Sequence, residues 1–142
     1  MELKRGFVYD VIENGKNLHP IVVMDDTLDK GGCIKGVAFT HNEEGSEFCK
    51  NILLPKEYVV ESDSNGNRYE FQWEETDRGR TSIIRTGFLK SLEIVEPKVK
   101  GQITEQGLVW IEEQVKGIYD MVKGSISKHC INRRTGNNKR DD

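Results

Sequence analysis

The residue types that cleave a phosphodiester without a metal ion are all present in this chain. Such cleavage needs a base for the attacking hydroxyl, an acid for the leaving oxygen and a cation for the charge that develops on the phosphate. Histidine serves as acid or base near neutral pH, and arginine carries the charge better than lysine because its planar group donates two hydrogen bonds at once. The candidates are His19, Thr40, His41, Arg85 and Lys90.

Each candidate also has an ordinary structural interpretation. His19 precedes a proline at the start of an apolar run, where a histidine can cap a strand, and Thr40 ends a strand. His41 stands in a polar stretch typical of solvated surface, and Arg85 and Lys90 fit common strand or turn cations. No third ligand has a spacing that would complete a metal site with the two histidines, so we expect neither a metal nor a cofactor.

Three β-rich runs position the first of these residues. They cover residues 5–12, 19–24 and 34–40, and glycine-containing polar connectors separate them. Asn14 and Gly15 tolerate the positive φ of a tight turn, so the chain can reverse there. The run at 19–24 is apolar throughout, which predicts a strand buried on both faces.

The second half of the chain continues the β pattern up to Pro97. Pro55 interrupts residues 52–60 because proline cannot donate to a strand ladder. Residues 62–67 predict a hairpin turn, and residues 68–73 then alternate as a half-buried return strand. Its aromatic residues could stack on bases, but their alternation favours core packing: Tyr69, Phe71 and Trp73. Two further strands are expected at Ser82–Arg85 and Phe88–Val95.

From Thr104 the apolar period becomes helical. Apolar residues recur at spacings of 3, 4, 3 and 4 at Leu108, Ile111, Val115, Ile118 and Val122. Thr104 is suited to cap the helix, and Glu105 suits the positive end of its dipole. We therefore predict a helix over about 104–123, weakened by two glycines and held by packing.

Length and composition predict one domain, residues 1–124, and a basic tail, residues 125–142. About seven short strands followed by a helix predict a mainly β fold, an SH3-like small β-barrel with a C-terminal helix. The sequence contains no run of eighteen apolar residues and no signal peptide, so a cytoplasmic protein is expected. The three cysteines have no C-x-x-C spacing and predict neither disulfides nor a zinc site.

The charge of −3 is spread unevenly along the 142 residues. Residues 128–142 carry five cations against two aspartates, so residues 1–127 carry −6. Because lysine and arginine supply most of the affinity for nucleic acid, an acidic body counts against strong RNA binding unless a local basic cleft survives.

The motifs along residues 4–122 resemble, in order and spacing, those of the MazF/PemK family of toxins from bacterial toxin–antitoxin pairs. The family commonly opens with Lys-Arg-Gly-x-Val/Ile-Tyr, continues with Arg-Pro and a β-branched run, and ends its third strand in Thr or Ser. The matching segments here are Lys4-Arg5-Gly6-Phe7-Val8-Tyr9, His19-Pro20-Ile21-Val22-Val23, Phe39-Thr40-His41, Ser82-Ile83-Ile84, Phe88-Leu89-Lys90-Ser91-Leu92-Glu93 and Lys98-Val99-Lys100-Gly101.

The resemblance implies a barrel of the MazF/PemK/CcdB type and a homodimeric, metal-independent endoribonuclease that cuts single-stranded RNA and is neutralised by a cognate antitoxin polypeptide. The family links the Arg of Arg-Pro and the Thr or Ser to cleavage; Thr40 matches, whereas His19 replaces the arginine. On this reading His19, Thr40 and Arg85 are the catalytic residues. The residues expected to bind RNA are His41, Lys90, Ser82 and Lys35.

Two other functions remain open. The acidic body and the missing arginine favour a catalytically inactive SH3-like barrel that binds a protein or peptide. A DNA- or gyrase-directed relative of the same fold is the third, because such toxins share the barrel and cut no RNA.

Overall fold

A computed structural model describes most of the chain before residue 124. The described residues are 3–13, 16–17, 19–29, 31–40, 51–73, 75–76, 79–80, 83–84, 91–94, 97–117 and 119–123. Two of the expected features, the strand at Phe88–Val95 and the basic tail, therefore lie partly or wholly outside the described residues.

The described chain is mainly β, with one α-helix and one short 3-10 helix, η1. The strands are β1 (Phe7–Tyr9), β2 (Ile12–Glu13), β3 (Lys16–Asn17), β4 (Ile21–Asp25), β5 (Cys33–Thr40), β6 (Ile52–Leu53), β7 (Val59–Val60), β8 (Glu75–Thr76), β9 (Gly79–Arg80), β10 (Ile83–Ile84), β11 (Ser91–Glu93), β12 (Val99–Ile103) and β13 (Asp120–Lys123). The helices are η1 (Lys56–Tyr58) and α1 (Glu105–Val115).

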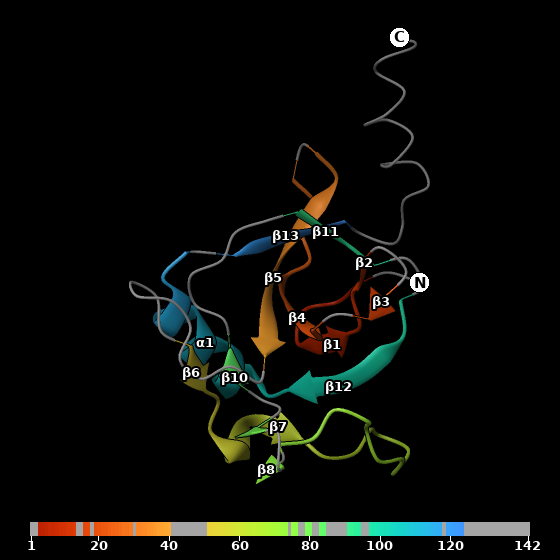
Figure 1. Ribbon diagram of the computed structural model, residues 1–142, viewed down its shortest axis with the longest axis vertical. Coiled ribbons are helices and arrows are strands. Elements are labelled where there is room, and N and C mark those ends of the chain that lie inside the picture. Colours follow the sequence, from red (N-terminus) through yellow and green to blue (C-terminus); the bar gives the residue numbers. More distant parts are fainter. Residues whose placement is uncertain are drawn as a thin grey trace, which may run out of the picture.

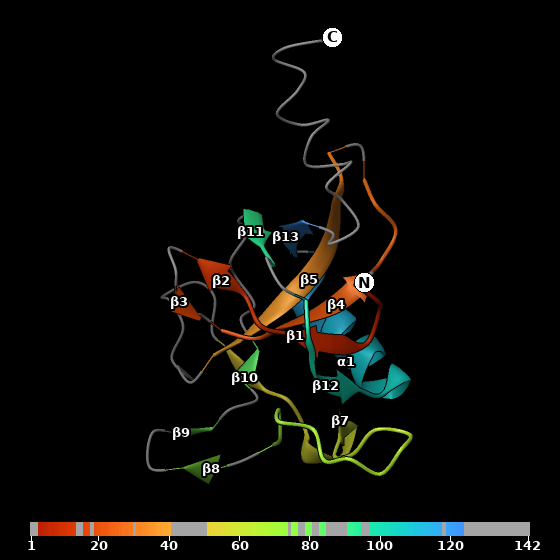
Figure 2. The same cartoon turned by 90° about the vertical axis from the view of Figure 1, so that its right-hand side faces the viewer.

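One strongly curled sheet contains nine of these strands and forms a half-barrel (Figures 1 and 2). Its order is β11-β13-β5-β4-β1-β12-β7, and β10 joins β5 to β6. All described pairs within it are antiparallel except β11 with β13. Two short hairpins, β2–β3 and β8–β9, lie outside this sheet.

The eight-residue strand β5 is the centre of the sheet. Along one edge it pairs with β4, where Ile21 lies opposite Ala38. Along the other edge its first half pairs with β13, and its last two residues, Phe39 and Thr40, pair with Ile84 and Ile83 of β10. Both ends of β5 are thus held by different partners.

The sheet is buried on both faces, which explains the unbroken apolar run of β4. The first cluster lies between the sheet and α1: Val8, Val22, Met24, Val37, Phe39, Leu54, Val59, Phe71, Ile84, Ile103, Leu108, Ile111 and Val115. The second cluster packs on the opposite face: Leu3, Tyr9, Val11, Ile21, Val23, Ile34, Ala38, Ile94 and Val122. Successive residues of β4 alternate between the clusters, as the pleat of a strand requires.

Helix α1 begins where the sequence predicts and ends eight residues earlier than the predicted position 123. The Thr104 hydroxyl accepts a hydrogen bond from the Gly107 amide at 3.0 Å and caps the first turn. At the other end Lys116 has a φ of 48° and Gly117 a φ of 86°, a left-handed pair that stops the helix. Val122, expected on the helix, is therefore a buried residue of β13 opposite Ile34.

The predicted turn before residue 68 is confirmed and two predicted strands are corrected, while the turn predicted at Asn14 and Gly15 lies outside the described residues. Residues 63–67 form the expected turn, in which the Asp63 amide donates to the Asn67 carbonyl at 2.9 Å. The return strand at 68–73 is wrong: within that segment a single bridge, Ser62 with Arg68, is formed. Residues 5–12 hold β1 and the start of β2 rather than one continuous strand.

Among the described helices, none is both long and apolar enough to span a lipid bilayer.

Candidate functional site

His19 and Thr40, predicted to act together, meet at one end of the central strands. The register of β4 and β5 pairs Ile21 with Ala38, and the Phe39 amide continues it by donating to the Pro20 carbonyl at 2.8 Å. Extending this register by one step beyond Pro20 and Phe39 puts the position of His19 across from that of Thr40. Residues at such facing positions of antiparallel strands have Cβ atoms about 5 Å apart.

The two residues differ in their access to solvent. His19 is exposed, whereas Thr40 is only 7% exposed. Thr40 is flanked on its other side by Ile83 of β10, which is fully buried. His19 is therefore the member of the pair that can meet a molecule arriving from solvent, and Thr40 forms the floor beneath it.

Four of the predicted site residues lie outside the described residues: the catalytic candidate Arg85 and the RNA-binding candidates His41, Ser82 and Lys90. Three of the four are close in sequence to Thr40 or to β10. His41 directly follows Thr40, and Ser82 and Arg85 flank the two residues of β10 that pair with the end of β5.

Lys35, the remaining RNA-binding candidate, is not part of this site. It lies five positions before Thr40 on β5, about 16 Å away along an extended strand. Its ammonium group lies over the Tyr119 ring, 5.5 Å from the centroid. The structure thus separates Lys35 from His19 and Thr40.

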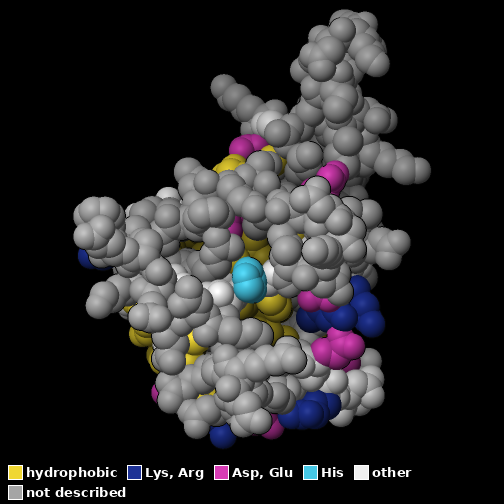
Figure 3. Space-filling view, in the orientation of Figure 1, with side chains coloured by type: hydrophobic (Ala, Val, Ile, Leu, Met, Phe, Trp, Pro, Cys, Tyr) yellow, Lys and Arg dark blue, Asp and Glu magenta, His cyan; other side chains and the backbone are white. Residues whose placement is uncertain are grey.

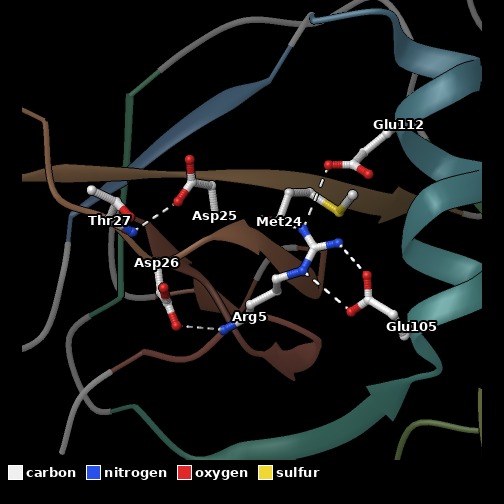
Figure 4. A network of polar contacts seen from close by, with 7 residues as sticks. All are labelled: Arg5, Met24, Asp25, Asp26, Thr27, Glu105 and Glu112. Carbon is white, nitrogen blue, oxygen red and sulfur yellow. Dashed lines mark hydrogen bonds and ion pairs between the residues drawn. The ribbon is translucent and has the colours of Figure 1, made fainter.

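A second polar cluster, centred on Arg5, was not expected from the sequence (Figure 4). The Arg5 guanidinium donates to both carboxylate oxygens of Glu105, at 2.8 Å and 3.4 Å, and forms an ion pair with Glu112 at 3.5 Å. It also donates to the Met24 carbonyl. Because Glu105 and Glu112 belong to α1, Arg5 joins the amino-terminal segment and β4 to the helix. We call these residues the Arg5 cluster.

The pKa values of residues in and beside the Arg5 cluster are shifted from their ordinary values. The hydrogen bond from Arg5 holds the pKa of the Glu105 carboxyl below its ordinary value, and the same bond raises the pKa of Arg5. The Thr27 amide donates to Asp25 at 2.9 Å and lowers the pKa of that carboxyl. Burial, with the nearby Glu112 charge, raises the pKa of Tyr119. Arg5 is thus occupied by carboxylates rather than available to a phosphate.

Lys100 is neutralised in the same way on the other side of the sheet. Its ammonium group contacts the Glu70 carboxylate and an Asp10 oxygen at 3.2 Å. The Glu70 hydrogen bond raises the pKa of Lys100, and in return the pKa of Glu70 is lowered.

The aromatic residues of the 68–73 segment divide between core and surface. Phe71 is buried in the first cluster, and Trp73 packs against that cluster while donating from its indole nitrogen to the Leu54 carbonyl at 2.7 Å. Tyr69 instead lines an open pocket of about 420 Å³ beside the hairpin, together with Phe7, Asp63, Arg68, Glu70, Lys98 and Val99. The expected core packing is confirmed for Phe71 and Trp73.

Charges of both signs lie close together on one face of the molecule. On the face in Figure 3, dark blue and magenta side chains lie next to each other rather than forming a basic patch. Within the described ranges no group of three His, Cys, Asp or Glu side chains could hold a metal ion.

Comparison of the chain with protein-family models, with curated proteins and with solved structures finds no match.

Proposed function

We propose that this chain is a metal-independent endoribonuclease that cuts single-stranded RNA, as its resemblance to the MazF/PemK toxins implies. The observation that carries the proposal is the placement of His19 opposite Thr40 at the adjoining ends of β4 and β5. Strand register alone brings the two positions together, and the proposal adds that a histidine beside a hydroxyl at the end of these strands has the chemistry of an acid–base site.

The proposed reaction is a transesterification within the RNA. His19 takes the proton of a ribose 2′-hydroxyl, whose oxygen attacks the adjacent phosphorus. The bond from phosphorus to the 5′-oxygen breaks, and that oxygen receives a proton from a water molecule, whose hydroxide takes up the proton that His19 had accepted. The products are a 2′,3′-cyclic phosphate and a 5′-hydroxyl, with no redox change. Arg85 supplies the charge that stabilises the phosphorane.

Thr40 acts in this proposal as a positioning residue. Its side chain is nearly buried, so it holds the His19 ring and the edge of the site rather than contacting bulk solvent. His41, Ser82 and Lys90 are proposed to bind the RNA from the segments that adjoin β5, β10 and β11 respectively.

The wider context follows from the same resemblance. We propose an SH3-like barrel of the MazF/PemK/CcdB type over residues 1–124 that acts in the cytoplasm as a homodimer. A cognate antitoxin polypeptide would neutralise it.

The direct test is cleavage of a 5′-labelled single-stranded RNA in the presence of EDTA. We expect cyclic-phosphate products from the wild-type protein and a loss of about 10²-fold or more in rate for His19→Gln. Thr40→Val removes the hydroxyl at nearly constant volume and should reduce the rate less. Lys98→Gln, an exposed cation outside the site, is the matched control. Intact RNA at a large excess of folded wild-type protein would refute the proposal.

Expression in a bacterial host tests the biological role. Growth arrest with mRNA cut at a short recurring sequence, relieved in the His19→Gln variant, would support a toxin. Normal growth and intact mRNA with confirmed expression would contradict it.

The second candidate is a catalytically inactive barrel that binds a protein or peptide. The use of Arg5 and Lys100 in ion pairs with carboxylates favours it, because these described cations are not available for phosphates. Absence of cleavage, together with a polypeptide that binds at a defined stoichiometry, would select this function.

A further inference from the structure

The outward face of α1 carries an apolar groove that the acid–base site does not use. Tyr58, Val109 and Trp110 form its apolar part, and Glu105, Gln106 and Glu113 complete the lining of a space of about 310 Å³. Residues 106, 109, 110 and 113 recur at the spacing of one helical face, opposite the buried face of Leu108, Ile111 and Val115. We call this space the α1 groove.

The walls of the α1 groove are fixed by close packing. An added Cβ at Gly107 would lie 2.6 Å from the Tyr58 Cβ, so the absence of a side chain there lets η1 approach the helix. The Tyr58 and Trp110 rings lie 6.2 Å apart between centroids, with their planes inclined by 44°. The two rings are therefore in tilted contact with each other, and both are partly buried against the first cluster.

The exposed apolar surface of the groove is unusual for the described part of the chain. Val109 is 47% exposed, and among the described residues it is the only large hydrophobic side chain that is mainly accessible to solvent rather than buried or half-buried. A single exposed valine needs no explanation, but a valine beside two aromatic rings in a hollow is typical of a contact surface.

The charge around the groove is negative. Helix α1 contains the carboxylates of Glu105, Glu112 and Glu113 and no lysine or arginine. Arg5 compensates part of this charge through Glu105 and Glu112, which leaves Glu113 at the rim. Such a surface repels RNA phosphates and attracts cations.

Aromatic faces elsewhere in the molecule already carry a cation. Lys35 lies over the Tyr119 ring at 5.5 Å, and Lys56 lies over the Trp73 ring at 5.9 Å. Among the described side chains no such contact is formed with Tyr58 or Trp110. The α1 groove therefore combines π-faces and a carboxylate, the two features that hold a lysine or arginine side chain from another segment.

We propose that the α1 groove binds a basic polypeptide segment of a partner, in which a lysine or arginine lies against the solvent-accessible side of the Tyr58 and Trp110 pair and a neighbouring apolar residue contacts Val109. The volume suits one or two side chains rather than a folded surface. The charged head group pairs with Glu113. This interaction is independent of the ribonuclease site and is expected whether or not the chain cleaves RNA.

The test uses the full chain labelled with ¹⁵N and a synthetic, end-blocked peptide of sequence Lys-Leu-Arg-Lys-Leu-Arg. The chain has two tryptophans, so its spectrum holds two indole N–H signals, and Trp110→Phe assigns them. We expect the Trp110 signal to shift saturably with peptide and the Trp73 signal to stay unchanged. A peptide with glutamate in place of each lysine and arginine is the charge control and should produce no shift.

Variants then locate the contact. Glu113→Lys should weaken the affinity about tenfold and Glu113→Gln about threefold, while Glu61→Gln, an exposed carboxylate outside the groove, should leave it unchanged. Val109→Lys places a cation in the groove at an exposed position that the fold tolerates, and it should weaken binding by about tenfold. Raising the salt concentration should weaken binding by the wild-type protein.

Three results would overturn the proposal. The first is no shift of the Trp110 signal at millimolar basic peptide. The second is equal affinity for the acidic peptide or for the Glu113→Lys variant. The third is a concentration-dependent dimer by light scattering that Val109→Lys abolishes, because the groove would then be covered by a second copy of the chain.

Discussion

Two polar regions of the molecule are formed by different kinds of contact: one is at the Thr40 end of β5, and the other is the Arg5 cluster. At the Thr40 end, a strand register brings a histidine and a hydroxyl together above apolar neighbours. In the Arg5 cluster, a guanidinium bridges segments 100 positions apart and is saturated by carboxylates and a carbonyl. The contacts of Arg5 with carboxylates and a carbonyl stabilise the fold, whereas His19 is exposed to solvent just before β4.

The largest effect should come from His19. On the proposed function, replacing it with Gln should reduce RNA cleavage by about 10²- to 10³-fold, because the proposed acid–base group is lost while a polar side chain remains. Since His19 is exposed, the midpoint of thermal unfolding should change by no more than about 1 °C. Cleavage rates and calorimetry on the same preparation check both. A large fall in thermal stability would mean that His19 is a structural cap.

A substitution at Gly107 tests how closely η1 packs against α1. Gly107→Ala should lower the free energy of unfolding by about 1–2 kcal/mol, because the added methyl overlaps the Tyr58 Cβ and Ile103, which outweighs the gain in helix propensity. Urea unfolding measures the change. Gln106→Ala, at an exposed position of the same helix, is the control and should be neutral or slightly stabilising. Stabilisation by Gly107→Ala would show that Tyr58 is free to move.

Arg5→Met removes the bridge between the amino-terminal segment and α1 while keeping the length of the side chain. The midpoint of thermal unfolding should fall by about 4 °C, mainly through the hydrogen bond to the Met24 carbonyl. RNA cleavage measured well below the midpoint should be unchanged. Loss of cleavage without loss of stability would place Arg5 in the catalytic site and remove the contrast between the two regions.

The smallest effect is a pH dependence within the Arg5 cluster. The pKa of Glu105 is lower in the folded chain than in the unfolded chain, where a glutamate has a pKa of about 4.3. Its contribution to stability is therefore present above that value and is lost as the pH falls through the folded pKa. The stability difference between wild type and Arg5→Met should shrink from about pH 5 to pH 3, and unfolding series at those pH values measure it. A difference independent of pH would assign the effect to the Met24 carbonyl alone.

The sequence predicts those parts of the fold that depend on neighbouring residues. The apolar run predicted at 19–24, the turn at Asn65 and Gly66 and the cap at Thr104 are local signals; the strand is confirmed as Ile21–Asp25, and the turn and the cap are confirmed. The end of the helix was missed because Gly117 was interpreted as a weak interior position, although glycine after the last apolar residue is the usual stop signal. The apolar spacing continues to Val122 because Val122 is itself a buried residue, although it belongs to β13 and not to the helix.

The polar contacts described above likewise include some that the sequence could predict and some that it could not. The meeting of His19 and Thr40 follows from two predicted strands in antiparallel register, so sequence reasoning could reach it. The contacts of Arg5 with Glu105 and Glu112 depend on how the helix crosses the sheet, and no local pattern encodes that crossing. Lys35 was predicted to bind RNA, but it lies on β5 five positions before Thr40, and the length of an extended strand keeps the two residues apart.

The division of β5 between two partners has a consequence for the exchange of amide hydrogens. Because this strand borders β4 on one edge and both β13 and β10 on the other, its central amides can open only when several pairings are lost together. Gly36 adds to this, since Ile21 and Val122 close over it, at 2.9 Å and 3.0 Å from the position of a Cβ. These amides should exchange only through global unfolding, so their protection reports the stability of the whole domain. Thr40 lies at the end of the same strand, so the backbone there is held by the same pairings.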